Sequence, residues 1–127
     1  MTKDGEKLNI VNKKGEIIGE ATREDIHEKG LLHREVHVWL YTPDCKIIFQ
    51  HRAKDKDTYP DLLDASVGGH VEIGDSFETA AVKELEEEAS IEANIDELQY
   101  ILTMRGRFYD EITGMTNNVL RAIYVFQ

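Results

Sequence analysis

Apolar residues alternate with polar ones along several stretches of this chain, and this pattern predicts β-strands. The clearest stretch covers residues 33–41, where Val36, Val38 and Leu40 fall on one face and His37 falls on the other. Similar runs predict further strands at 6–12, 17–20, 46–52, 99–109 and 119–126. A short glycine-containing turn joins the first two of these runs, so we expect an N-terminal β-hairpin.

Two other stretches have the spacing of helices. Thr22 is a suitable N-cap for a brief helix that reaches His27, and Gly30 is a suitable stop. A second helix is predicted after Ser76, and its apolar positions fall four residues apart at Phe77, Ala81 and Leu85. This apolar stripe predicts that the second helix docks against the sheet, which fixes the direction of its remaining side chains.

Three glutamates on the second helix are the main candidates for chemistry. Glu84, Glu87 and Glu88 stand at positions i, i+3 and i+4, so their side chains leave one helix face within a single turn. The plain alternative is a glutamate run on a solvated helix face. Repulsion among the carboxylates, together with the close backbone approach that Gly68 and Gly69 allow, favours a site for Mg²⁺ or Mn²⁺.

Residues 69–91, which read GHVEIGDSFETAAVKELEEEASI, resemble the Nudix box. That motif is a glycine, five residues, a glutamate, seven residues, and then Arg-Glu-apolar-any-Glu-Glu-any-Gly-apolar. Gly69 takes the first position, and Glu84, Glu87 and Glu88 take the acidic positions of the second half. The register holds along the whole segment, and such a long fixed spacing is a specific signal.

The resemblance implies both a fold and an activity. It implies an α/β (α+β) fold, in which a mixed β-sheet is sandwiched between helices. It also implies hydrolysis of a diphosphate joined to another group, with Glu84, Glu87, Glu88 and the Gly69 carbonyl holding the metal. Either Glu87 or Glu88 would act as the catalytic base.

Three positions depart from the motif. Lys83 stands in place of arginine, so it keeps the charge but loses the planar two-point grip on a carboxylate. Asp75 stands in place of glutamate, and because it is one methylene shorter we expect it to reach its partner only if the backbone shifts. Ser90 replaces the last glycine, at a cost of about 1 kcal/mol if a left-handed turn is kept there. None of these changes removes a carboxylate from the predicted metal ligands.

Basic residues outside the motif are candidates for substrate binding. Arg52 follows the apolar run of one predicted strand, and the alternative is that it lies in a solvated loop. Arg105 lies on another predicted strand, and the alternative is that it belongs to an exposed strand face. His70 follows the motif glycine. In the isopentenyl-diphosphate isomerase branch, which the N-terminal lead-in also resembles, histidines matching His33 and His70 help bind a metal, whereas in the hydrolases a histidine there is often local structure. Those isomerases carry a cysteine where this chain has Gly68, so the resemblance favours hydrolysis.

Composition narrows the class of protein. A chain of 127 residues with 41% hydrophobic residues predicts one domain, residues 1–127, in which residues 1–30 form the hairpin and cap. The formal net charge of -10 argues against binding to a nucleic-acid polymer. The single cysteine, Cys45, allows no internal disulfide, and no apolar run has membrane-spanning length. We therefore expect a cytoplasmic enzyme, and the resemblance implies that its substrate is a small-molecule diphosphate.

The chain stops directly after its last predicted strand. Proteins of the resembled family usually continue into a further strand and a closing helix, so we expect the C-terminal helix to be missing through loss or through truncation at Gln127. An uncovered apolar sheet face would then predict a homodimer.

The expected function is metal-dependent cleavage of the pyrophosphate linkage in a nucleoside diphosphate derivative or a related organic diphosphate. An isopentenyl-diphosphate isomerase-like enzyme and a catalytically weak Nudix-like binding module are the alternatives.

Overall fold

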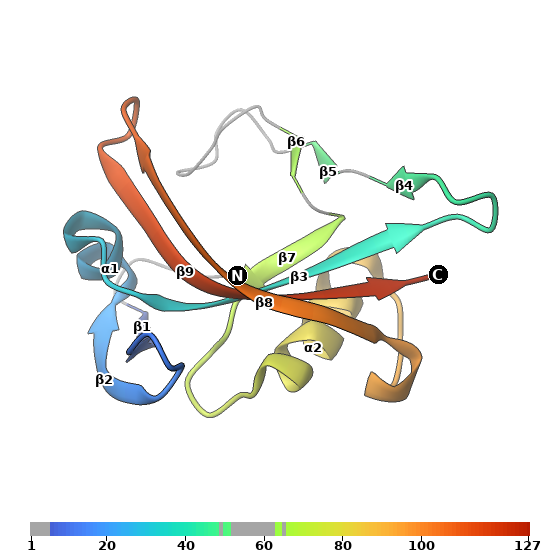
Figure 1. Cartoon of the computed structure of the whole chain (residues 1–127), viewed down its shortest axis with the longest axis horizontal. Coiled ribbons are helices and arrows are strands. Elements are labelled where there is room, and N and C mark those ends of the chain that lie inside the picture. The colour runs from blue at the N-terminus through green and yellow to red at the C-terminus, as the bar shows by residue number, and fades with distance from the viewer. Residues whose placement is uncertain (1–5, 49, 52–62, 65) are drawn as a thin grey trace.

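The computed structural model describes residues 6–48, 50–51, 63–64 and 66–127. Its centre is a seven-stranded sheet in the order β2-β1-β3-β9-β8, with β4 and β7 also paired to β3 (Figure 1). The strands of this sheet are β1 (Lys7–Val11), β2 (Ile17–Thr22), β3 (His33–Tyr41), β4 (Ile47–Ile48), β7 (Val67–His70), β8 (Gln99–Asp110) and β9 (Met115–Phe126). The described helices are α1 (Arg23–Lys29), α2 (Phe77–Ala89) and a 3-10 turn at Ile95–Glu97, and the short strands β5 (Gln50–His51) and β6 (Leu63–Asp64) pair with each other.

The N-terminal hairpin and its helix form at the places that the sequence predicts. β1 and β2 pair antiparallel, and α1 follows β2 directly. The Thr22 hydroxyl accepts a hydrogen bond from the Asp25 N–H at 3.1 Å, which caps the first turn of α1. Gly30 ends the helix with φ 66° and donates its N–H to the Ile26 carbonyl, a left-handed cap that glycine adopts at little cost.

β3 is the strand on which the sheet is assembled. It runs parallel to β9 from the His33↔Val119 pair to the Leu40↔Phe126 pair. On its other edge it runs antiparallel to β7, where Glu35 lies opposite His70. The sheet is therefore mixed.

The alternation along β3 gives the sheet two different faces. Val36 and Val38 are fully buried and pack with Ala81 and Leu85 of α2, so α2 covers one face. His33 points to the other face and contacts the ring of His27 from α1. The two helices thus lie on opposite faces of the sheet, which confirms the predicted mixed sheet between helices.

The structure differs from the sequence prediction in two segments. The segment predicted as a loop over 110–118 contains only a short turn, and β9 already begins at Met115. The strand predicted over 46–52 is divided into β4 and β5, and Arg52 lies outside the described residues. β8 forms one edge of the sheet and carries exposed apolar side chains, among them Ile101 and Phe108. Association of two chains through an uncovered apolar sheet face stays a prediction.

Candidate active site

Two of the predicted metal ligands, Glu84 and Glu88, lie against the backbone of β7. A Cβ at Gly69 would lie 2.5 Å from Oε1 of Glu84, so the Glu84 carboxylate occupies the space that glycine leaves open. The N–H of Gly68 donates to Oε1 of Glu88 at 3.3 Å. Since Glu84 and Glu88 lie one helical turn apart on α2, both carboxylates reach the same short piece of backbone.

Crowding of these carboxylates changes their protonation. Burial, the hydrogen bond with Glu88 and the charges of Glu88 and Glu87 together raise the pKa of Glu84 to about 8. A carboxylate with such a pKa holds a proton at neutral pH unless positive charge is brought close to it. The donor set, three carboxylates beside a glycine backbone, fits a hard divalent cation.

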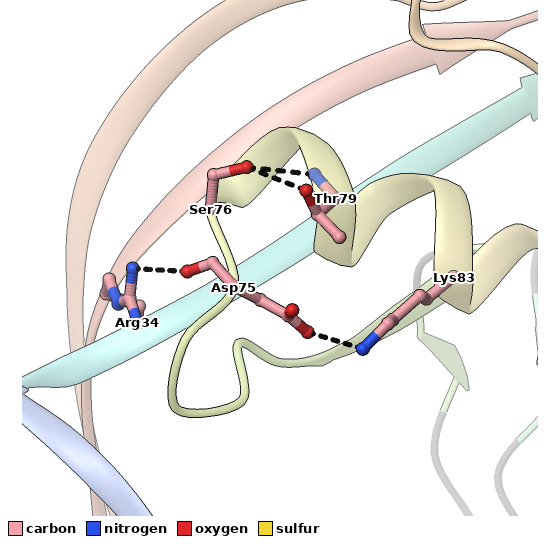
Figure 2. Close-up of polar contacts among 5 residues, drawn as sticks. All are labelled: Arg34, Asp75, Ser76, Thr79 and Lys83. Carbon is pink, nitrogen blue, oxygen red and sulfur yellow. Dashed lines mark hydrogen bonds and ion pairs between the residues drawn. The ribbon is translucent and has the colours of Figure 1, made fainter.

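Asp75 and Lys83, two of the positions that depart from the motif, pair with each other (Figure 2). Lys83 Nζ donates to Asp75 Oδ2 at 2.8 Å, and this hydrogen bond raises the pKa of Lys83. The Asp75 carbonyl accepts a hydrogen bond from Arg34 Nη1 at 2.9 Å, and the Ser76 hydroxyl accepts the Thr79 N–H at 3.1 Å. The shorter aspartate side chain therefore reaches Lys83 directly, and no backbone shift is needed for this contact. The Asp75 carbonyl connects the loop before α2 to Arg34 of β3.

The end of α2 keeps the geometry that the motif glycine usually provides. Ser90 has φ 56° and ψ 32°, in the left-handed region, and its N–H donates to the Glu86 and Leu85 carbonyls. The Ile91 N–H also donates to the Leu85 carbonyl, at 3.1 Å. These bonds close the last turn, and the serine carries the backbone strain that a glycine would avoid.

Two of the residues that the sequence proposes for substrate binding, Arg105 and His70, do not join this site, and the third, Arg52, lies outside the described residues. Arg105 lies on β8, which β9 and β3 separate from β7, and its Nε donates to Asn118 Oδ1 at 3.3 Å. His70 follows Gly69 on β7, but its side chain points to the opposite face of the strand, toward α1. Of the residues proposed from sequence, the structure thus gathers Gly69 with the glutamates of α2, beside the Asp75–Lys83 pair.

Comparison with known proteins identifies the family of this chain. Residues 31–126 match the model of the NUDIX domain. An uncharacterized Nudix hydrolase of Clostridium acetobutylicum is 37% identical over 107 residues, which cover 82% of this chain and 52% of that protein. The chain belongs to the Nudix family.

Other Nudix proteins extend the comparison. Nudix hydrolase 3 of Arabidopsis thaliana is 30% identical over 98% of this chain, which corresponds to 15% of that much longer protein. The structure of DR0079 from Deinococcus radiodurans superposes with a TM-score of 0.66 and 27% identity, covering 96% of this chain and 73% of that one. The E. coli dihydroneopterin triphosphate pyrophosphohydrolase shares the fold, with a TM-score of 0.53 and 21% identity over 75% of this chain and 70% of that one. The chain spans about half the length of the Clostridium relative.

A second group of titratable residues in this Nudix domain is a histidine cluster. One ring nitrogen each of His27, His33 and His70 lies within 4.8 Å of the others, and His33 Nε2 is buried without a hydrogen-bond partner among the described residues. Burial and the neighbouring His33 lower the pKa of His70 to about 3, and burial also lowers the pKa of His33. Neutral imidazoles at this spacing can hold a metal ion. The sequence had pointed to His33 and His70 but not to His27 of α1 as a member of this cluster.

A polar cluster of Glu35, His37 and Arg121, which the sequence did not predict, lies on the sheet face opposite α2. Arg121 Nε donates to Glu35 Oε1 at 2.7 Å, and His37 Nε2 lies 2.8 Å from the same oxygen. Burial alone would raise the pKa of Glu35, but the hydrogen bond from His37 and the charge of Arg121 hold it well below its usual range. Only the alternation along β3 could have placed Glu35 and His37 together, since Arg121 lies in a distant part of the sequence.

No helix within the described part of the chain is long and apolar enough to span a membrane.

Proposed function

We propose that this Nudix domain hydrolyses a diphosphate linkage in a nucleoside diphosphate derivative, with Mg²⁺ or Mn²⁺ bound by Glu84, Glu87, Glu88 and the Gly69 carbonyl. The observation that carries the proposal is the packing of the Glu84 carboxylate against Gly69, with Glu88 on the adjacent Gly68 N–H. These contacts bring carboxyl oxygens and a glycine backbone together at β7. The high pKa of Glu84 supports it, because a bound cation would offset both the desolvation of this carboxylate and its repulsion by Glu88 and Glu87.

The residues of this site have separable tasks in the proposed reaction. A bound divalent cation supplies positive charge to the phosphate oxygens and acidifies water near them. Glu84 is the most enclosed of the three carboxylates and serves as a ligand. Glu87 and Glu88 are exposed on the same helix and are placed to accept the proton of the attacking water. The absence of a side chain at Gly69 leaves room for the Glu84 carboxylate beside its backbone.

The Asp75–Lys83 ion pair supports the site from the side. Lys83 immediately precedes Glu84 on α2, and its bond to Asp75 connects the helix to the loop that enters it (Figure 2). Through the Asp75 carbonyl, Arg34 connects the same loop to the central strand. This chain of contacts fixes the position of α2 relative to β7, so that the carboxylates meet the glycine backbone at a defined distance.

A metal-dependent assay tests the proposal directly. Release of phosphate and nucleoside monophosphate is measured for nucleoside diphosphate conjugates, nucleoside triphosphates, coenzyme A and isopentenyl diphosphate, with Mg²⁺, with Mn²⁺ and with EDTA. We expect metal-dependent release from at least one nucleoside diphosphate conjugate, lost in Glu87→Gln and Glu88→Gln and kept in the exposed control Glu86→Gln. Release that survives EDTA, or no release from any member by folded protein, would refute the proposed function.

One observation favours a second candidate, the isopentenyl-diphosphate isomerase-like enzyme. The cluster of His27, His33 and His70 is the kind of donor set that the isomerase resemblance implies for two of these positions. The glycine at position 68, where that resemblance places a catalytic cysteine, counts against this candidate. The same assay separates the two functions, because isomerisation would convert isopentenyl diphosphate without releasing phosphate.

A further inference from the structure

β8 forms one edge of the central sheet, and its side chains are open to solvent on both faces (Figure 1). In the part of the chain that the structure describes, β8 pairs with β9 alone, so backbone N–H and C=O groups point outward along its other edge. Every residue from Gln99 to Tyr109 is exposed except Gly106, which is half-buried. A strand of 12 residues with such an edge is a template on which another strand can pair.

The middle of β8 is apolar on both of its faces. Leu102 pairs with Ile123 on the sheet face away from α2, whereas Tyr100 pairs with Tyr124, which belongs to the core beneath α2. The large apolar side chains of this strand are between 43% and 57% exposed, and they are Tyr100, Ile101, Leu102, Met104, Phe108 and Tyr109. A contiguous apolar run of this kind marks a surface that associates with another protein.

The opposite edge of the sheet, β2, is built in a way that hinders such pairing. β2 has six residues, half the length of β8, and its register with β1 shifts at a bulge between Ile10 and Val11. Short edge strands and bulges are features that protect a sheet edge from pairing with another chain. On β8 the register shifts only near its start, between Tyr100 and Leu102, and the strand then continues regularly to Asp110.

The charges along β8 complement a second copy of the same strand in the antiparallel orientation. Asp96 and Glu97 lie directly before the strand, and Arg105 and Arg107 lie in its second half. Glu97 precedes Leu102 by five positions and Arg107 follows it by five. A two-fold axis near Leu102 therefore brings the arginines of each copy to the acidic residues of the other, whereas a parallel copy would place like charges side by side.

The same segment is also locally neutral. The chain has a formal net charge of -10, so two copies repel each other over most of their surfaces. Residues 95–109 contain two acidic and two basic residues, which cancel. This balance favours contact between copies at β8 over contact at the acidic surface of α2.

We propose that β8 is an interaction surface on which a second copy of this chain pairs antiparallel, about a two-fold axis near Leu102, so that the two sheets become continuous. This pairing gives hydrogen-bond partners to the outer backbone groups of both strands and buries the apolar side chains at the centre of β8. It also forms the contacts between arginine and acidic side chains twice. β3 and β9 separate β8 from β7, so the inference does not depend on the proposed hydrolytic site.

Sedimentation velocity of the whole chain, over about a hundredfold range of concentration, measures the association. We expect a reversible equilibrium between monomer and dimer that salt weakens, because salt screens the paired charges. Hydrogen exchange locates the contact: amides of β8 should exchange more slowly at the high concentration, whereas amides of β2 should not change. A monomer at every concentration, or a dimer that leaves exchange along β8 unchanged, would overturn the proposal.

Substitutions test the position of the two-fold axis. Leu102→Lys places two ammonium groups near the axis and should raise the Kd of the dimer about tenfold or more. Ile18→Lys is the matched control, because Ile18 is an exposed apolar residue on the other edge strand, and it should leave the Kd unchanged. A dimer that survives Leu102→Lys with wild-type Kd, or that Ile18→Lys dissociates, would refute pairing through β8.

A charge exchange tests the antiparallel orientation. Arg107→Glu should raise the Kd of the dimer, because it sets the new carboxylate near Glu97 of the partner subunit. Adding Glu97→Lys to the same chain exchanges the two charges and should return the Kd toward the wild-type value. A double variant that associates no better than Arg107→Glu would contradict the antiparallel arrangement.

Discussion

Replacement of Glu84 by glutamine should stabilise the metal-free protein at high pH. The native pKa of Glu84, about 8, lies above the 4.5 of an unperturbed glutamate. Between these pH values the native state holds a proton that the unfolded chain has released, so this residue's contribution to stability is complete below pH 4.5 and is lost as the pH rises through 8. Glutamine is never charged and escapes this loss.

The size of the effect follows from the same pKa. A rise from 4.5 to about 8 corresponds to roughly 5 kcal/mol if the full shift opposes folding at high pH. Glu84 is only half-buried and solvent screens its charge, so we expect about 2 kcal/mol in the free energy of unfolding. The difference between Glu84→Gln and wild type should vanish near pH 4.5, where the wild-type carboxyl is protonated as well.

Urea denaturation at pH 9 and at pH 4.5, in EDTA, measures this difference, and Glu86→Gln on the exposed side of α2 is the matched control. With saturating Mg²⁺ at pH 9, wild type should become more stable than Glu84→Gln, because the variant lacks one carboxylate ligand. A ligand present at about 100 times its Kd stabilises the protein that binds it by about 2.7 kcal/mol. A Glu84→Gln protein no more stable than Glu86→Gln in EDTA at pH 9 would show that the carboxylates of α2 do not repel one another as argued.

Three further predictions concern single residues. Ser90→Gly should raise the free energy of unfolding by about 1 kcal/mol in urea titrations, because glycine adopts φ 56° without strain; an unchanged midpoint would contradict this. Glu87→Gln and Glu88→Gln should each be stably folded, and at least one should lower kcat by about 100-fold or more in the metal-dependent assay, whereas near wild-type turnover in both would remove these carboxylates from catalysis. His70 has a native pKa of about 3, so below pH 6.5 it is neutral in the folded protein and charged in the unfolded chain. As the pH falls from 6.5, the free energy of unfolding of wild type should therefore decrease faster than that of His70→Gln, by up to about 1.4 kcal/mol per pH unit. Parallel curves of unfolding free energy against pH would refute this.

Local features of the sequence predicted the elements well. Thr22, Gly30 and Ser76 each determine a helix end through their own backbone and side chain, so the chain within a few residues carries the information. The approach of Glu84 to Gly69 could likewise be predicted, because the motif sets both the helical phase and the distance from the glycine. What the carboxylates do in catalysis remains a proposal.

Features that depend on pairing between distant strands could not be predicted from local patterns. Arg121 and Glu35 are 86 positions apart, and only the parallel register of β3 and β9 brings them together. Asn117 and Asn118 resemble turn residues, yet they lie within β9, where the Asn118 side chain donates to the Gly30 carbonyl at 3.0 Å. Here tertiary contacts outweigh the local preference of asparagine for turns.

The two glycines on β7 have a consequence for how such a domain can evolve. Because Gly69 meets the Glu84 carboxylate and Gly68 meets His37, the two faces share backbone but no side chain at this point. Substitutions on the His37 side of β7 can therefore accumulate without moving the Glu84 side chain on the other side. A duplicated copy of this domain can thus diverge on one side of a single strand, while purifying selection holds the other side fixed.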